Sequence, residues 1–183
     1  NVPKTVWYKK SHNSGTYGRS LLLDFVDTEF DFPKSLYSVE DILRCFVLDN
    51  KNAVILDFFG GSGTTAHATF RLNKQDGGLR KCILVTNNEL SKSESERLKE
   101  RGLEEGHKEW TEQGIFHSAT MPRIKSAISG MKSSGESLTG NYAFVDKFPY
   151  SDGFEENVRF LELGYVDYDM IQRNRSFGDI API

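Results

Sequence analysis

The sequence predicts an α/β fold in which a mostly parallel sheet carries flanking helices, and three neighbouring segments support this. Residues 53–59 (AVILDFF) form a continuous apolar run that ends at glycines, as a buried parallel strand does. Residues 64–72 (TTAHATFRL) fit a helix that faces inward through Ala68 and Leu72. Residues 81–86 (KCILVT) have the pattern of a second buried strand. Strand, tight glycine turn, helix and strand together make one right-handed βαβ unit.

The chain as a whole is expected to divide into two parts. Residues 1–20 are polar and rich in glycine and serine, so we expect an extended N-terminal segment that continues from a missing upstream part. Residues 21–183 would then form the folded domain, which is long enough for one sizeable core. Within it, residues 36–48 (LYSVEDILRCFVL) are expected to form a helix. Ser38 and Asp41 resemble a capping box at its start.

The chain after the unit becomes charged and then irregular. Residues 91–110 (SKSESERLKERGLEEGHKEW) predict one solvated helix. Pro122 suits the first turn of a further helix, which Gly130 would end. Residues 141–148 and 158–167 alternate enough to predict two more strands.

The composition is that of an ordinary soluble domain. No run of about 18 apolar residues could span a membrane, and the first ten residues hold no secretory core, so we expect a cytoplasmic protein. Cys45 and Cys82 each lie in an apolar stretch and are expected to be reduced core thiols. The histidines show no ligand spacing, so we expect no metal site. The net charge of −3 is unlike that of a free-standing DNA binder, which usually has a basic face.

The turn between the first strand and the helix predicts a ligand site. Residues 61–66 (GSGTTA) satisfy the pattern G-x-G-x-x-[GA], in which glycines let a ligand approach the backbone closely. No lysine follows as in G-K-[ST], which disfavours a triphosphate. A dinucleotide such as NAD would need an acidic residue about 20 positions later, for which Glu89 is a loose candidate.

S-adenosylmethionine fits the same turn through different chemistry. Asp57 could accept from the ammonium group of its amino-acid end or organise the turn. The N–H groups at the helix start, with Thr64 and Thr65, could hold its carboxylate. Phe59 could form an aromatic wall beside its sulfonium, although the ring could equally be ordinary core packing.

Two motifs resemble those of one enzyme family. Residues 57–65 (DFFGGSGTT) are similar to the cofactor motif D-x-F-x-G-x-G-T-T of DNA amino-methyltransferases. Residues 32–37 (FPKSLY) resemble the second cofactor motif of the same family. Their order is that of the beta-type group, which includes adenine-N6 methylases and the modification subunits of type III restriction systems. Residues 82–91, 121–130 and 154–163 also resemble segments of such enzymes.

The resemblance implies a Rossmann-like fold that binds S-adenosylmethionine over residues 21–183, a fold that is incomplete in this chain. It places Pro33, Lys34 and Ser35 near the methionine end of the cofactor, and the ribose contact among residues 86–89. The expected cofactor-binding residues are Phe32, Pro33, Lys34, Ser35, Asp57, Phe58, Phe59, Gly60, Gly61, Ser62, Gly63, Thr64, Thr65, Thr86, Asn87, Asn88 and Glu89.

The sequence departs from the family in two respects. The acidic residue expected at the end of the second strand is missing, since Thr86 stands there with Asn87, Asn88 and Glu89 just beyond. The larger departure is an absent motif. These enzymes carry a [DNS]-P-P-[YFW] motif that holds the target amino group, and no such tetrapeptide occurs in the 183 residues. We therefore expect no catalytic residue in this chain and no activity from it alone. The whole enzyme would methylate adenine N6 of double-stranded DNA, with a restriction subunit as a possible partner. Cytosine-N4 methylation, an NAD-binding oxidoreductase domain and an assembly module paired with a separate catalytic chain remain as alternatives.

Overall fold

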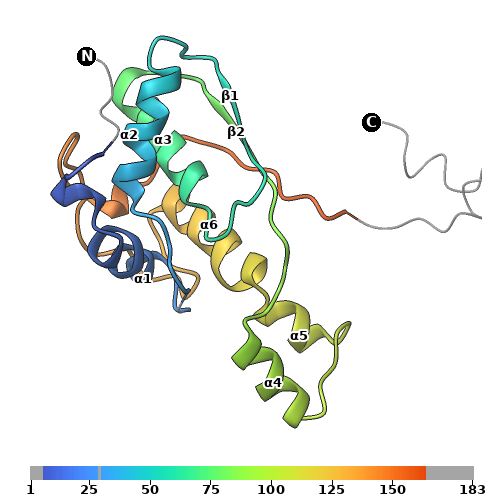
Figure 1. Cartoon of the computed structure of the whole chain (residues 1–183). Helices are drawn as coiled ribbons and strands as arrows, with labels where there is room; N and C mark the ends of the chain where they lie inside the picture. Colours follow the sequence, from blue (N-terminus) through green and yellow to red (C-terminus); the bar gives the residue numbers. More distant parts are fainter. Residues whose placement is uncertain (1–5, 29, 164–183) are drawn as a thin grey trace, which may run out of the picture.

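The computed structural model describes residues 6–28 and 30–163. Its centre is a parallel pair of strands, β1 (Val54–Asp57) and β2 (Lys81–Leu84), in which Val54 pairs with Lys81 and Asp57 with Leu84. Helix α3 (Thr64–Asp76) connects them (Figure 1). The expected strand, turn, helix and strand are thus confirmed as a small parallel sheet within a mixed fold.

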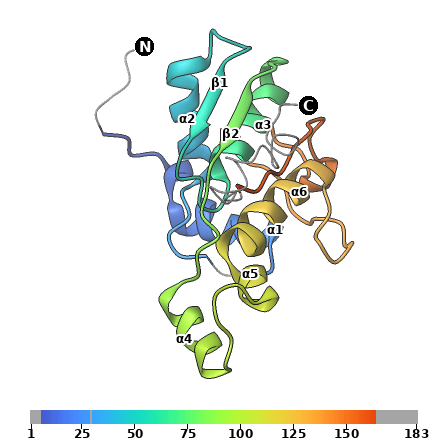
Figure 2. The ribbon, with the colours of Figure 1, turned by 90° about the vertical axis from the view of Figure 1, so that its right-hand side faces the viewer.

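The sheet is covered on one face. Helices α2 (Leu36–Val47) and α3 lie behind β1 and β2 in Figure 2. Ile55, Cys82 and Leu84 face these helices and pack against the core, whereas Val54, Leu56 and Ile83 are more than half exposed. The prediction that both strands are fully buried was therefore wrong, because the described elements supply apolar partners on only one side of the sheet.

The N-terminal segment is more structured than expected. It contains a short 3-10 helix, η1 (Lys10–His12), then a π-helical stretch, η2 (Gly15–Ser20), which runs into α1 (Leu21–Phe25). The side chain of Asn13 accepts from the backbone N–H of Thr16 at 2.8 Å and so begins this helical stretch. The extended conformation that we expected up to residue 20 is therefore wrong for η1 and η2.

Helix α2 begins earlier than its expected capping residue. Its N-cap is Ser35, whose Oγ accepts from the N–H of Ser38 at 3.4 Å. The Ser38 hydroxyl donates back to the Ser35 carbonyl, so Ser38 lies inside the helix, and the expected cap at Ser38 was wrong. Cys45 lies on the outer side of α2 and is exposed, contrary to its expected core position. Cys82 is partly buried, and burial raises the pKa of its thiol to about 11.

The charged segment after β2 forms two helices instead of one. These are α4 (Lys92–Glu100) and α5 (Lys108–Gln113), which lie together at the lower end of Figure 1. Gly102 and Gly106 adopt φ of 76° and 97° between them, a conformation that a helix cannot continue through. A π-helical stretch, η3 (Phe116–Thr120), then leads into α6 (Met121–Ser129), which Gly130 ends in a left-handed conformation as expected.

The two strands expected near the C-terminus are absent from the described residues. Residues 141–148 contribute only an isolated bridge between Asn141 and Pro149, followed by the 3-10 helix η4 (Tyr150–Asp152). Residues 158–163 have no regular structure, and residues 164–167 of that expected strand lie outside the described residues. Tyr142, Tyr150 and Phe154 instead complete the core between α1, α3 and α6.

Candidate functional site

The glycine turn lies directly after β1 and is tied to the end of β2. The N–H of Gly60 donates to the carbonyl of Val85 at 2.9 Å, and the N–H of Val85 donates to the carbonyl of Asp57 at 2.8 Å. A Cβ atom at Gly60 would overlap the side chain of Leu84. Gly63 has a φ of 78°, so the turn needs glycine both for a close approach and for a left-handed conformation.

Asp57 holds both ends of the turn. Its Oδ1 accepts from the backbone N–H of Phe59 at 3.1 Å, and its Oδ2 accepts from the hydroxyl of Thr65 at 2.6 Å. Of the two roles open to this carboxylate, organising the turn is thus visible in the structure. Each carboxylate oxygen has a second lone pair, so Asp57 retains the capacity to accept from a ligand.

Helix α6 and the stretch before it support the turn from the side of the protein interior. The Thr120 hydroxyl donates to the carbonyl of Gly61 at 2.6 Å. The guanidinium Nη1 of Arg123 donates to the carbonyl of Ser62 at 3.2 Å and to the Thr64 hydroxyl at 2.7 Å. Because the C=O and N–H of a trans peptide point in opposite directions, the bond at Gly61 turns the N–H of Ser62 away from α6.

A buried polar chain continues inward from Arg123. Its Nε donates to Nδ1 of His67 at 3.3 Å, and Nε2 of His67 lies 2.7 Å from the hydroxyl of Tyr142. Burial, with the nearby guanidinium groups of Arg123 and Arg71, holds the pKa of His67 well below its ordinary value. His67 is therefore neutral at pH 7, in the tautomer that donates from Nε2.

The structure brings Phe30, two residues before the upstream motif, to the glycine turn. A Cβ atom at Gly61 would lie 3.5 Å from Cζ of Phe30, so that ring lies against the turn. Pro33 and Ser35 are buried, and the Ser35 hydroxyl donates to the carbonyl of Ser11 at 2.6 Å. Lys34 is exposed. The segment is thus anchored at Pro33 and Ser35, whereas its lysine extends into solvent.

Three expected aromatic residues are solvent-exposed. Phe32, Phe58 and Phe59 are 87%, 62% and 89% exposed. Core packing is therefore the wrong explanation for Phe59, because most of its side chain lies outside the protein interior. Its ring is 5.8 Å from that of Phe58, centroid to centroid, and the pair forms an apolar surface beside the turn.

The segment expected to contact a ribose contains one residue that is already engaged. The side chain of Asn88 donates to the carbonyl of Thr111 at 2.7 Å and accepts from the N–H of His117 at 3.3 Å. It therefore fixes α5 and η3 to the end of β2. Asn87 and Glu89 are exposed, and the hydroxyl of Thr86 donates to the carbonyl of Asn87.

Sequence reasoning missed three residues of this site: Phe30, Thr120 and Arg123. Phe30 had a usable signal, since it stands two residues before the upstream motif of residues 32–37. Thr120, Arg123, Ile124 and Ala127 recur at helical spacing, which marks one inward face on α6. Nothing in that spacing shows which distant element the face contacts.

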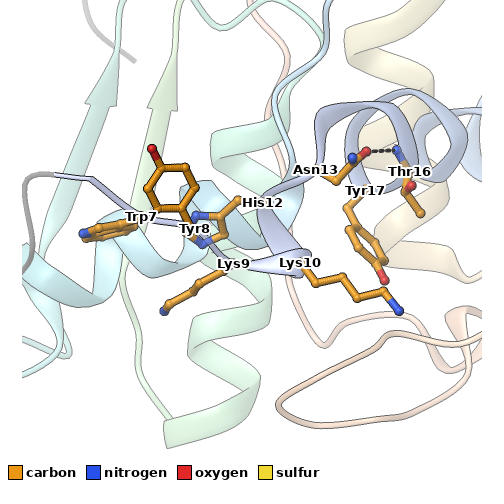
Figure 3. A pocket seen from close by; sticks show the side chains of 8 residues that line it. All are labelled: Trp7, Tyr8, Lys9, Lys10, His12, Asn13, Thr16 and Tyr17. Atoms are coloured by element: carbon orange, nitrogen blue, oxygen red, sulfur yellow. Dashed lines mark hydrogen bonds between the residues drawn. The ribbon is translucent and has the colours of Figure 1, made fainter.

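Two cavities in the described part of the chain lie away from the glycine turn. One of about 470 Å³ is formed near the N-terminus by Trp7, Tyr8, Lys9, Lys10, His12, Asn13, Thr16 and Tyr17 (Figure 3). Another of about 420 Å³ lies at the C-terminal end of α3, beside Lys74 and Glu156. Within the described residues, no cluster of acidic, histidine or cysteine side chains could hold a metal ion. No helix in this part of the chain has the length and apolarity needed to cross a membrane.

Comparisons with known proteins point to one family. A family model described as DNA methylase matches residues 1–118. The type II methyltransferase M.KpnI of Klebsiella pneumoniae is 41% identical over 85 residues, which are 46% of this chain and 20% of that protein. The StyLTI Mod subunit, a type III restriction-modification enzyme of Salmonella typhimurium, is 46% identical over 74 residues, 40% of this chain and 11% of the relative.

A third relative extends the match. The type III EcoP15I Mod subunit of Escherichia coli is 30% identical over 127 residues, or 64% of this chain and 19% of the relative. The chain thus spans a fifth or less of the length of these relatives.

Proposed function

The chain belongs to the DNA methylase family, and from that premise we propose that its glycine turn binds the amino-acid end of S-adenosylmethionine. The observation that carries this proposal is the fixed shape of residues 57–65. Asp57 holds Phe59 and Thr65, while Thr120 at the end of η3 holds the carbonyl of Gly61 and Arg123 of α6 holds that of Ser62. The first amide groups of α3 have no acceptor within their own helix, so a carboxylate can accept from them.

The residues present fit the other parts of this cofactor. The remaining acceptor capacity of Asp57 suits its ammonium group. The exposed ring of Phe59 offers the face that a sulfonium cation prefers. Lys34 is exposed and free to approach the methionine end. For the ribose hydroxyls we propose Glu89 or Asn87, because the Asn88 side chain is engaged at both ends.

We propose that the sheet is part of a Rossmann-like methyltransferase fold. A ligand at the carboxyl ends of β1 and β2, in front of the N-terminus of α3, has the position usual in such folds. The turn, the first residues of α3 and the aromatic pair would then position the donor. Because no [DNS]-P-P-[YFW] tetrapeptide occurs in the 183 residues, we propose that this chain contributes no catalytic residue.

The proposed reaction is methylation of adenine N6 in double-stranded DNA. S-adenosylmethionine would supply the methyl group, and the target base would be flipped out of the duplex so that its amino nitrogen reaches the methyl carbon in line. This chain would hold the donor. Cytosine N4 is the second candidate, because nothing in these residues discriminates adenine from cytosine. A restriction subunit as partner and a cytoplasmic location belong to the same proposal.

Calorimetric titration with S-adenosylmethionine tests the proposed site. We expect saturable 1:1 binding that a Gly60→Val exchange abolishes, because the added side chain would overlap Leu84. A titration with NAD separates this proposal from an NAD-binding oxidoreductase domain. Tighter binding of NAD than of S-adenosylmethionine would refute the proposal.

The absence of a Pro-Pro-aromatic motif leads to a separate expectation. The purified chain should transfer no radiolabelled methyl group to duplex DNA, because nothing in its sequence matches the residues that hold the target amino group. Methyl transfer above that of a denatured sample would contradict this expectation without affecting the cofactor site.

A further inference from the structure

Arg123 is a buried cation whose hydrogen bonds run to the glycine turn and its helix. Its side chain has no exposed surface. Nη1 donates to the Ser62 carbonyl, the Ser62 hydroxyl and the Thr64 hydroxyl at 3.2, 3.1 and 2.7 Å, and Nε donates to His67. Nη2 is buried and has no hydrogen-bond partner among the described residues. The side chain therefore retains hydrogen-bonding capacity directly beneath the turn.

No carboxylate within the described chain balances this charge. The other two buried arginines each have one: Arg71 pairs with Glu40 at 2.6 Å and Arg80 with Asp76 at 2.8 Å. Around Arg123 the acceptors are neutral oxygens and the neutral ring of His67. A buried charge without a counter-ion is costly, so an unpaired arginine in this position calls for a reason.

The position of the charge makes the imbalance greater. The bonds to Ser62 and Thr64 place the guanidinium at the N-terminus of α3, where the helix dipole is already positive. Cations usually occur at the opposite end of a helix, because the N-terminus favours negative charge. Burial lowers the pKa of Arg123 to about 10, so the group stays protonated at neutral pH. The charge of Arg123 and the positive end of the α3 dipole therefore lie at the same turn.

We propose that Arg123 is a positioning residue that both shapes the glycine turn and supplies the positive field that holds the carboxylate of the methyl donor. A carboxylate in front of α3 provides the negative charge that the described residues lack. The inference rests on the proposed function, since it assumes that this carboxylate occupies the turn.

Two ligands, one with and one without the amino-acid end and the sulfonium charge, separate this role from a purely structural one. S-adenosylmethionine carries the carboxylate, whereas 5′-methylthioadenosine keeps the adenosine and lacks the whole amino-acid end. In Arg123→Gln, the amide retains hydrogen bonding but removes the charge. We expect its affinity for S-adenosylmethionine to fall about tenfold or more, with methylthioadenosine affinity changed by less than about twofold. Arg123→Lys, which keeps a cation, should recover part of the loss.

Arg80→Gln is the matched control. Arg80 is equally buried but lies at the far end of α3, where it bonds to Asp76 and to the carbonyl of Val47. This variant should lower the melting temperature while leaving the ratio of the two affinities unchanged. Each variant is measured below its own melting transition, so that folded protein is compared with folded protein.

The outcomes separate the inference from the proposed function. If wild-type protein binds neither ligand, the proposed function fails. If wild-type protein binds both, and Arg123→Gln weakens both in parallel or neither, Arg123 is only structural and the inference is overturned. If Arg123→Gln does not fold, decarboxylated S-adenosylmethionine decides with wild-type protein. It should bind about tenfold more weakly than S-adenosylmethionine, and equal affinity overturns the inference.

Discussion

At the scale of single residues, the bond between Asp57 and Thr65 ties the end of β1 to the start of α3. Thr65→Val keeps the side-chain volume and removes the hydroxyl that Asp57 accepts from at 2.6 Å. We expect the affinity for S-adenosylmethionine to fall about tenfold, the cost of one hydrogen bond to a charged group. Calorimetric titration would measure this change.

The matched control for that exchange lies one turn further along the helix. Thr69→Val removes a hydroxyl that donates to the backbone carbonyl of Thr65 and not to Asp57. Its affinity for the cofactor should equal that of wild type. Equal affinities of Thr65→Val and Thr69→Val for S-adenosylmethionine would show that the hydrogen bond between Thr65 and Asp57 has no part in binding.

His67 makes the stability of the protein depend on pH. Its pKa is held well below the ordinary value of 6.5 by burial and by two guanidinium groups. The unfolded chain therefore takes up a proton that the folded chain does not, and stability present above about pH 6.5 is lost on acidification. The free energy of unfolding should fall by up to about 1.4 kcal/mol per pH unit from this group.

Urea unfolding at several pH values between 7 and 5 checks the role of His67. His67→Gln should flatten the dependence, since the titrating group is gone. His107→Gln removes an exposed histidine and should retain the wild-type slope. The same slope in His67→Gln as in wild type would exclude His67 as the source.

At the scale of elements, α3 begins and ends at glycines in the same conformation. Gly63 and Gly77 have φ of 78° and 65°, and neither has a backbone atom in the way of a Cβ. An alanine at either position should destabilise the protein by roughly 1 kcal/mol, because a left-handed conformation strains any residue with a side chain. Thermal unfolding would measure both variants.

Only one of these two exchanges should affect ligand binding. Gly63→Ala alters the turn itself, so we expect weaker binding of S-adenosylmethionine as well as lower stability. Gly77→Ala lies at the other end of the helix and should bind as wild type does. Cofactor affinity that is lost equally in both variants would place the ligand away from the turn.

The βαβ unit could be predicted because its signals are local. An apolar run, a glycine turn and a helix start each occupy a few neighbouring residues between 53 and 72. The charged segment after residue 90 was misjudged because its pattern of charges suited one helix, whereas Gly102 and Gly106 interrupt it. The prediction of two C-terminal strands was wrong because the aromatic residues of that segment pack against α3 and α6 and have no sheet partner.

The site could be predicted only in part, for the same physical reason. The spacing of Asp57 and the glycines within one short stretch was enough to predict them as site residues. Arg123 reaches Ser62 across 61 residues of sequence, and no local pattern reveals a contact at that separation. The role of Asn88 was equally hidden, because its partners Thr111 and His117 come from elements that follow much later.

At the scale of the whole molecule, the outer face of the sheet in the described part of the chain exposes apolar side chains beside Lys81. Val54, Leu56 and Ile83 are 62%, 62% and 53% exposed, next to one another on adjacent strands. Contiguous apolar surface of this kind drives association. We expect the isolated chain to self-associate with rising concentration, as sedimentation velocity would show.

Substitution on that face tests its role in association. Replacing Leu56 and Ile83 together by threonine keeps strand-forming residues and lowers the apolar area, so association should decrease. Phe46→Thr, which removes one exposed ring on α2 and leaves both strands unchanged, should leave association unchanged. The same association in the double variant as in wild type would rule out the sheet face as its cause.

One measurement addresses the binding claim directly: amide chemical shifts of labelled protein titrated with S-adenosylmethionine. The account predicts that the largest shifts fall on Gly61 to Thr65 at the start of α3, with much smaller shifts there when methylthioadenosine is added. If saturation with the cofactor leaves the resonances of these amides unshifted and shifts only distant ones, such as those of α5, the binding claim is contradicted.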